Sequence, residues 1–231
     1  RFLVFGFVGW RAYHVGFTHD ESLSFTLLQG DQTQLWTANN HWGNTALMWL
    51  SASLFGNSEW ALRLPNVLSF LVFTYSIYLI HKNFLKSSWS LWITFPILLL
   101  NPFVLDFFSL ARGYGLGLSF FSMALFFVLQ FCFSSNGRTT LLKLLLFSLL
   151  CIYSNYAFVL PIACMLIASL LFRFQFYFQH WKQMLLPTLL FVALLLPALW
   201  NILYLSKLCE LYAGGTNNVF ADTIKSILNF S

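Results

Sequence analysis

Two adjacent carboxylates, Asp20 and Glu21, directly follow the first apolar segment of the chain. Carboxylates beside a segment that could cross a membrane cost free energy, so they invite a functional interpretation. One of them could act as a general base while the other orients it or holds a cation. The same stretch, Thr18-His19-Asp20-Glu21, also has the S/T-x-x-E spacing of a capping box that begins a helix before the apolar run 23–28. Because adjacent residues point in different directions, we do not expect the two carboxylates to flank one bond as a glycosidase pair does.

A second polar block occupies residues 39–45 and contains three asparagines, His41 and Trp42. Its amides and imidazole suit hydrogen bonding to a polar ligand such as a sugar, with the indole as a stacking face. The same residues also suit a turn followed by a helix cap at Asn44. The sequence favours neither interpretation over the other.

A third polar block lies between two apolar segments and contains Asp106 and Arg112. We expect Pro102 to end or kink the preceding segment, because a proline interrupts helical hydrogen bonding. Arg112 could bind a phosphate through its planar guanidinium, or it could lie at the interface as an ordinary anchor. Glycines recur at every second position from Gly113 to Gly117 and predict close helix packing, since no strand precedes them as in a nucleotide-binding loop.

The composition indicates the class of protein, and hence the type of secondary structure, in which these three polar blocks occur. Of the 231 residues, 59% are hydrophobic, 20% are aromatic and only 8% are charged, and the mean hydropathy is +0.74. A water-soluble globule needs far more polar surface, so the sequence predicts an all-α, polytopic integral membrane protein. The net charge of +5 forms no basic patch and indicates cytoplasmic loops rather than nucleic-acid binding. The spacing of the four cysteines predicts neither a metal site nor a disulfide framework.

The apolar segments predict where the chain crosses the membrane, since a helical crossing takes about 20 residues. Residues 2–10 resemble the tail of a truncated first span, and four further spans are expected over 64–80, 89–105, 113–134 and 183–206. Residues 139–179 could form one long crossing, which would put Arg173 and Lys182 outside, but a hairpin of two short helices is preferred. A hairpin places six basic residues on one side, which the positive-inside rule names cytoplasmic: Lys82, Lys86, Arg138, Lys143, Arg173 and Lys182.

All seven acidic residues then fall on the opposite side, together with the five remaining basic residues considered: Asp20, Glu21, Asp31, Glu59, Asp106, Glu210 and Asp222, with Arg11, Arg63, Arg112, Lys207 and Lys225. The first external loop, residues 11–63, carries most of the polar chemistry. We expect interfacial helices over 21–28 and 45–55, because these short apolar stretches are interleaved with tryptophans. The chain begins without a methionine inside an apolar run, so we interpret residues 1–231 as one transmembrane domain of a longer protein whose later spans and any C-terminal external domain are missing.

The chain resembles the N-terminal half of the GT-C glycosyltransferases in three motifs that occur in the same order: Asp20-Glu21, the stretch 54–65 (LFGNSEWALRLP) and the stretch 109–114 (SLARGY). It is most similar to the family of protein O-mannosyltransferases and lipid A aminoarabinose transferases, over nearly its whole length. The F-G-x-S-x-x-A-L-R-L-P element is the most specific. Many relatives have a K-P-P-L type sequence where residues 40–44 stand here, and this difference leaves the sugar and the acceptor open.

The resemblance implies a GT-C-like bundle that transfers a sugar from a polyprenyl-phosphate donor to a protein, lipid or glycan acceptor, with inversion. It implies that Asp20 is the general base, that Glu21 supports it and that Arg112 is the leading phosphate clamp. Further substrate contacts are assigned to His41, Asn44, Arg63, Asp106 and Tyr114, with Asp106 contacting the acceptor or a metal. No cofactor is identified, and a divalent metal ion stays open. The expected location is the bacterial inner membrane, with the site on the extracytoplasmic face.

The alternative is a non-catalytic flippase or transporter of lipid-linked sugars, which needs polar residues along a path at mid-membrane. Asn155, with Ser148 and Ser154, is the candidate for such a path. Transfer should depend on an external carboxylate, whereas transport should depend on these residues.

Overall fold

The computed structural model describes residues 2–31, 36–37, 40–85, 87–133 and 137–208, and this part of the chain is helical and contains no strand. Four residues named above, Lys86, Glu210, Asp222 and Lys225, lie outside it. The helices are α1 (Phe2–His14), α2 (His19–Leu28), α3 (Trp42–Phe55), α4 (Glu59–Ile80), η2 (His81–Leu85), α5 (Ser88–Leu99), α6 (Pro102–Ser109), α7 (Tyr114–Phe133), α8 (Gly137–Ser154), η3 (Tyr156–Phe158), α9 (Val159–Phe172), α10 (Phe174–Gln179) and α11 (Trp181–Lys207).

Four of these helical segments are long and apolar enough to cross a membrane: 59–85, 114–133, 137–154 and 181–207. A fifth crossing is possible if α5 and α6 are taken together, although they are bent by 59°. The predicted single segment 89–105 is therefore two helices. The break follows from Pro102, as expected, and the Asn101 side chain caps α6 by accepting a hydrogen bond from the Phe103 N–H at 3.0 Å.

The segment predicted as the first external loop, residues 11–63, is more helical than expected where the structure describes it. Helix α1 continues past Arg11, and α2 and α3 begin two and three residues earlier than the expected 21 and 45. Helix α4 begins at Glu59, so Arg63 lies within its second turn rather than in a loop. At α2 the earlier start follows from the capping box of Thr18 and Glu21, which hydropathy alone does not reveal. The expected cap at Asn44 is wrong, because α3 begins at Trp42 and Asn44 lies within it.

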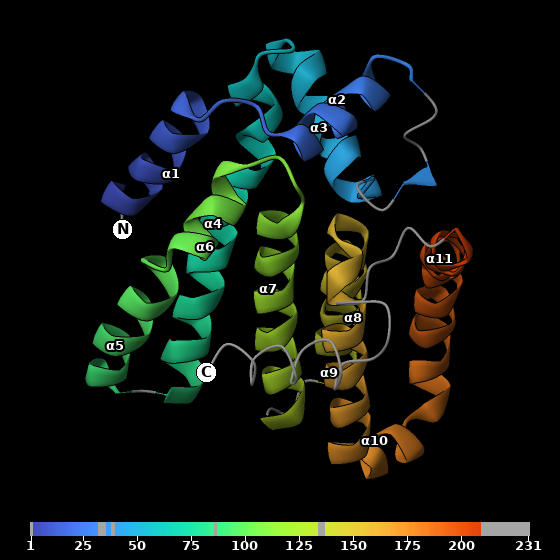
Figure 1. Ribbon diagram of the computed structural model, residues 1–231. Helices are drawn as coiled ribbons and strands as arrows, with labels where there is room; N and C mark the ends of the chain where they lie inside the picture. Colours follow the sequence, from blue (N-terminus) through green and yellow to red (C-terminus); the bar gives the residue numbers. More distant parts are fainter. Residues whose placement is uncertain (1, 32–35, 38–39, 86, 134–136, 209–231) are drawn as a thin grey trace, which may run out of the picture.

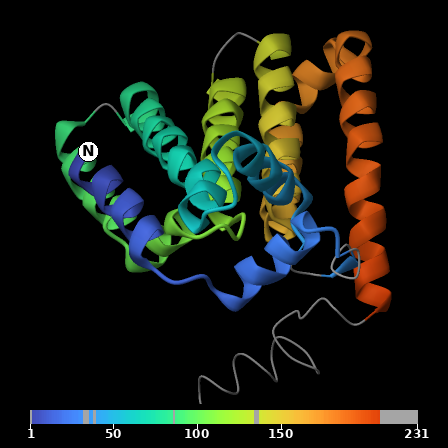
Figure 2. The same ribbon diagram turned by 90° about the horizontal axis from the view of Figure 1, so that it is seen from above.

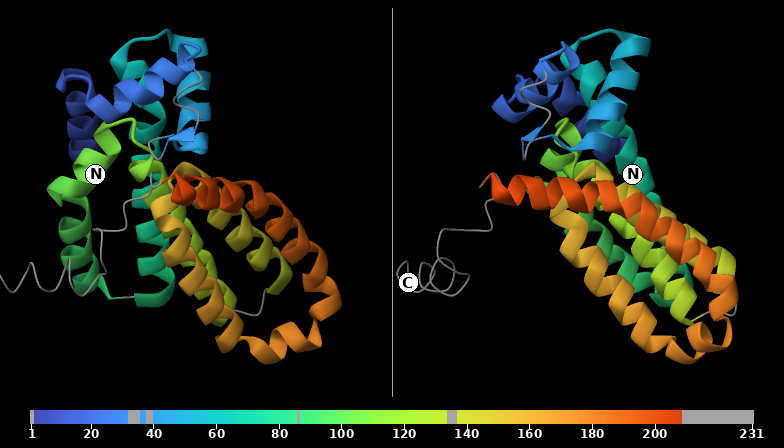
Figure 3. Two further views of the ribbon diagram at one scale, coloured as in Figure 1. Left: turned by 45° about the vertical axis from the view of Figure 1, so that its right-hand side comes forward. Right: turned by 90° about the vertical axis from the view of Figure 1, so that its right-hand side faces the viewer.

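The helices are arranged as a row of long helices with α2 and α3 at one end (Figure 1). Seen from above, α2 and α3 lie across the ends of this row (Figure 2). Helix α7 packs most extensively against α8 and α4, and α11 packs against α8. Figure 3 shows α10 joining α9 to α11 at the end of the molecule far from α2 and α3. We call the end that carries α2 and α3 the loop end.

The expected hairpin over 139–179 is confirmed, because α8 and α9 are joined by η3 and run in opposite directions. The end of α9 returns to the end of α7, where Phe172 lies 5.4 Å from Phe133 between ring centroids. The described basic residues of the predicted cytoplasmic side thus lie together at the end opposite the loop end: Lys82, Arg138, Lys143, Arg173 and Lys182.

The apolar core has two main parts. The larger joins α7, α8, α9 and α11 around fully buried residues such as Phe131, Leu144 and Ala198. The smaller joins α1, α4 and α6 around Phe70 and Phe108, whose rings meet edge to face at 5.0 Å. Many large apolar side chains of α5, α9 and α11 instead point outward, which is typical of helices that contact lipid.

Candidate functional site

A buried ion pair between Glu21 of α2 and Arg63 of α4 lies under the loop end. Both side chains are fully buried, and two parallel hydrogen bonds of 2.7 Å join the guanidinium to the two carboxylate oxygens. The remaining Arg63 donors bind the backbone carbonyls of Ala12, Val15 and Gly16 at 2.6–3.0 Å. All five N–H groups of Arg63 are therefore used within the protein, and they tie the end of α1 to α2 and α4.

The Glu21 carboxylate is equally well satisfied. Besides Arg63, it accepts the backbone N–H of Ala111 at 2.7 Å, and the N–H and hydroxyl of Thr18 at 2.9 and 3.0 Å. Burial raises its pKa, but the hydrogen bonds from Arg63, Ala111 and Thr18 outweigh burial and hold the pKa below its usual value. The capping interpretation of Thr18 and Glu21 is thus confirmed, and this carboxylate is ionised and fully engaged.

The segment before α7 is held from both sides by buried polar groups. Glu21 binds the N–H of Ala111, and the Asn44 amide donates to the carbonyl of the same residue at 2.9 Å. The Asn44 oxygen in turn accepts from Asn66 at 2.8 Å, and the Asn66 oxygen accepts the Leu116 N–H at 3.3 Å. This network fixes the backbone on which the next residue, Arg112, is carried.

Two glycines allow the backbones to approach closely enough for these contacts. Gly113 has a φ of 74°, and a Cβ there would lie 2.2 Å from the carbonyl oxygen of Ser154. A Cβ on Gly43 would lie 2.8 Å from the carbonyl oxygen of Tyr153. The start of α3, the turn before α7 and the end of α8 therefore meet at one point, and the close packing expected at Gly113 is confirmed.

A second carboxylate–guanidinium pair, Asp20 with Arg112, lies at the surface above this network. The two side chains are 30% and 37% exposed, so a ligand can reach both. The Arg112 guanidinium lies 5.6 Å from the centre of the Tyr114 ring, and that ring stacks on Phe107 at 5.0 Å. A helix rotates by about 100° per residue, so Asp20 points outward while Glu21 points inward.

His41, at the start of α3, lies beside this exposed pair. Its ring is 6.1 Å from Tyr114 and 6.3 Å from Tyr156 between centroids, and its Nε2 lies 3.2 Å from the amide nitrogen of Asn155. Its Nδ1 is buried and has no hydrogen-bond partner within the described part of the chain. Burial, followed by the charge of Arg112, lowers the pKa of His41 to about 4, so the imidazole is neutral at pH 7.

This shift predicts a pH dependence of stability. The folded-state pKa of His41 is lowered from 6.5 to about 4, so the unfolded chain binds more protons between these values and stability is lost as the pH falls from 6.5 towards 4. We expect the unfolding free energy of the wild type to drop between pH 7 and pH 5 by about 2 kcal/mol more than that of His41→Gln. Unfolding in detergent micelles at both pH values measures this, and equal drops in the two proteins would contradict it.

The structure divides the predicted site residues into three groups. Asp20, Arg112 and Tyr114 lie together near the surface with the half-buried His41 beside them, and Glu21, Asn44 and Arg63 form the buried network beneath. Asp106 pairs with Arg11 at 2.5 Å and joins α6 to α1.

Sequence reasoning assigned no site role to Asn66, Tyr156 or Asn201, and it considered Asn155 only as part of a transport path. Asn155 instead lies at the turn between α8 and α9, where its oxygen caps η3. The signal that could have found Asn201 is a single asparagine deep within the long apolar segment 183–206, whose other amide, Gln183, is its first residue.

No three His, Cys, Asp or Glu side chains of the described ranges lie close enough to hold a metal ion. Comparisons of the chain with models of known protein families, with curated proteins and with solved structures found no match.

Proposed function

We propose that the protein is a membrane glycosyltransferase that moves a sugar from a polyprenyl-phosphate donor to an acceptor hydroxyl, with inversion. The observation that carries this proposal is the exposed pair of Asp20 and Arg112, built on a fully satisfied buried pair of the same two residue classes. A carboxylate that accepts a proton and a guanidinium that binds phosphate are the two groups such a transfer needs.

Asp20 and Arg112 together account for the proton and the charge that the transfer reaction moves. The acceptor oxygen attacks the anomeric carbon and forms the new glycosidic bond, while Asp20 takes the hydroxyl proton. The bond between the anomeric carbon and the phosphate oxygen breaks, and its electron pair stays on the phosphate, where Arg112 stabilises the charge. In the free protein Arg112 pairs with Asp20, so binding of the donor phosphate would release the carboxylate for the acceptor.

Glu21 and Arg63 have a positioning role in this proposal. Their polar atoms are used within the protein and both side chains are fully buried, so neither offers a free group to a substrate. Arg112 is therefore the phosphate ligand, and the buried network holds the backbone before it in place.

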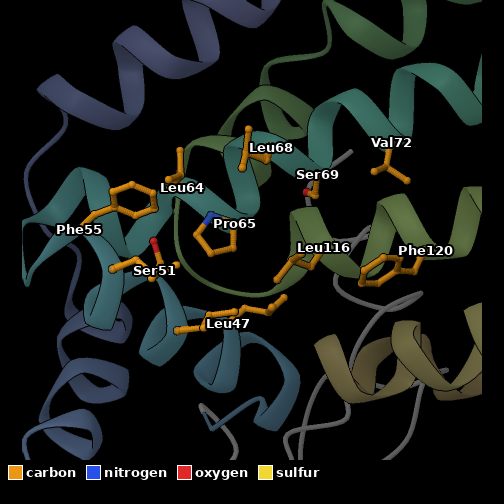
Figure 4. Close-up of a pocket in the computed structure, with 12 residues that line it drawn as sticks. Leu47, Ser51, Phe55, Leu64, Pro65, Leu68, Ser69, Val72, Leu116 and Phe120 are labelled. Atoms are coloured by element: carbon orange, nitrogen blue, oxygen red, sulfur yellow. The ribbon is translucent and has the colours of Figure 1, made fainter.

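An apolar groove beside the buried network supports the proposal that the donor is lipid-linked. It has a volume of about 350 Å³ and lies between α3, α4 and α7, with leucines and phenylalanines along its walls (Figure 4). Leu47 in its wall lies three residues after Asn44 on α3, and the backbone N–H of Leu116, also in its wall, bonds to Asn66. The groove therefore begins about one turn from the buried network. A prenyl chain matches these walls by burying apolar surface.

Pro65 explains the shape of one wall. Because a proline has no N–H, it leaves the carbonyl of Ala61 without its helical partner, and the Ser51 hydroxyl of α3 donates to that oxygen at 2.5 Å. This bond holds α3 against α4 beside the groove.

The distribution of charge supports a site on the extracytoplasmic face. The described acidic residues lie at the loop end, where three of them pair with Arg11, Arg63 and Arg112 and where Lys207 also lies. Five basic residues gather at the opposite end with no described acidic residue among them. By the positive-inside rule this distribution favours a cytoplasmic position for the latter end and an outside position for Asp20 and Arg112.

Reconstitution tests the proposal directly. The full chain in liposomes is supplied with radiolabelled polyprenyl-phosphate sugars and a mixed acceptor extract, and the label is followed into new products. Formation of a labelled product and free polyprenyl phosphate is expected. Movement of the lipid between leaflets without any product would contradict the proposal and favour a carrier.

Arg112 gives a sharper test. We expect Arg112→Gln to raise the KM for the donor by about 10- to 100-fold, because a charged hydrogen bond to phosphate is lost, and Arg112→Lys to recover part of the loss. Lys207→Gln removes a cation at the same end of the molecule, at the end of α11, and serves as the control. Equal donor KM values for Arg112→Gln and Lys207→Gln would remove Arg112 from the phosphate site.

A further inference from the structure

Deepening the proposed function and resting on it, we propose that Asn201 of α11, with Tyr156 and His41, forms a subsite that binds the hydroxyl groups of the donor sugar. Such a subsite would select the sugar, which the exposed pair of Asp20 and Arg112 cannot do because it contacts only the acceptor and the phosphate.

The first observation is an unpartnered amide oxygen. Asn201 is 1% exposed and lies in the apolar helix α11, where its amide nitrogen donates to the Tyr156 hydroxyl at 2.9 Å. Its Oδ1 has no hydrogen-bond partner among the described residues. A buried amide oxygen without a donor is costly, so a ligand hydroxyl at this position would complete its hydrogen bonding.

The second observation is that this amide belongs to a continuous group of polar side chains. Tyr156 connects Asn201 to His41, whose ring is 6.3 Å from the Tyr156 ring and whose Nδ1 also lacks a partner in the described structure. The charges of Arg112 and Asp20 both act on His41, so the group reaches the exposed pair. The side chains come from the residue that precedes α3, from η3 and from α11.

The chemistry of the group favours a neutral polyhydroxyl ligand. Asn201, Tyr156 and a neutral His41 carry no charge, and together they offer both donors and acceptors. An unpartnered oxygen accepts from O–H and repels a phosphate oxygen, so the phosphate belongs at Arg112 and the sugar at Asn201. The Tyr114 and Tyr156 rings beside His41 add aromatic faces on which a sugar can pack.

The depth of Asn201 is consistent with the sugar at Asn201 and the phosphate at Arg112. It lies six residues before Lys207, the last residue of α11, which is about 9 Å along a helix. The subsite is thus nearly two turns inside the loop end, below the surface that an acceptor would approach.

Binding measurements on the full chain in nanodiscs test the subsite independently of turnover. The probes are bare polyprenyl phosphate and the same lipid carrying mannose, glucose or arabinose. We expect the wild type to bind at least one sugar-bearing lipid more tightly than the bare phosphate. Asn201→Leu, of similar volume, should weaken that binding about 10-fold and leave the affinity for bare polyprenyl phosphate unchanged.

Two further variants guard against a purely structural effect. Tyr156→Phe removes one hydroxyl and should reduce the same sugar preference, whereas Thr188→Val removes a hydroxyl of α11 that bonds only within its own helix and should change nothing. An equal loss of affinity for bare and sugar-bearing lipids in Asn201→Leu would overturn the subsite, as would an unchanged preference. Absence of any transfer product from the wild type would instead contradict the proposed function, whatever the binding results.

Discussion

Asp20→Asn is expected to lower the kcat of the proposed sugar transfer by about 10²- to 10⁴-fold, the usual contribution of a general base. The amide keeps the shape of the carboxylate but cannot take the acceptor proton. Affinity for the donor should be retained or improved, because Arg112 loses the partner that competes with the phosphate. Initial rates at saturating donor and acceptor, compared with equilibrium binding of the donor, separate these two effects.

The matched control for this variant is Asp31→Asn, which changes another acidic residue of the first external loop outside the site. Asp31 is exposed and belongs to neither ion pair. Its kcat should stay close to that of the wild type. If Asp20→Asn turns over within a factor of two of Asp31→Asn, Asp20 is not the base and another group must accept the proton.

Arg63→Met should produce the largest loss of stability, about 3–5 kcal/mol, because it leaves the Glu21 carboxylate buried without its cation. It also leaves three backbone carbonyls at the end of α1 without their donor. Arg63→Lys should recover little, since an ammonium group cannot supply the parallel pair of hydrogen bonds and the bonds to α1 together. Denaturant unfolding in detergent micelles measures these differences.

Two comparisons make the result on Arg63 interpretable. Arg11→Met removes the cation of the pair with Asp106, which is about as exposed as the pair of Asp20 and Arg112, and should cost less than about 1 kcal/mol. The double variant Arg63→Met, Glu21→Leu removes both buried charges and should be more stable than Arg63→Met alone. A loss for Arg63→Met no greater than that for Arg11→Met would contradict the structural role of the buried pair.

The adjacent residues Asp20 and Glu21 take part in two different ion pairs of the loop end, one at the surface and one buried. Asp20 and Glu21 are adjacent, yet the helical rotation between them sends one to the surface and the other into the interior. The buried pair is saturated with hydrogen bonds, and the surface pair is open to a ligand. Rigid support beneath an accessible pair is the arrangement expected for a site whose geometry must be held.

Much of the helical arrangement could be predicted from the sequence. Hydropathy located the long apolar helices, the basic residues predicted the hairpin of α8 and α9, and Pro102 predicted the break between α5 and α6. The capping spacing at Thr18 predicted the start of α2. These features depend on local properties, namely the length of apolar runs, the missing N–H of a proline and the unsatisfied donors at a helix end. Such properties are determined by residues that are close in the sequence.

Only the tertiary structure decided which polar residues act together. Both Arg112, the leading phosphate clamp, and Arg63 were expected to contact the substrate, but packing buries Arg63 among the carbonyls of α1 and leaves Arg112 partly exposed. Asn201 is joined to Tyr156 across 45 residues, and Ala111 to Glu21 across 90. The sequence alone cannot specify such pairs, because they depend on how closely the helices approach. At the start of α3, the turn before α7 and the end of α8, the close approach is possible because Gly43 and Gly113 have no Cβ.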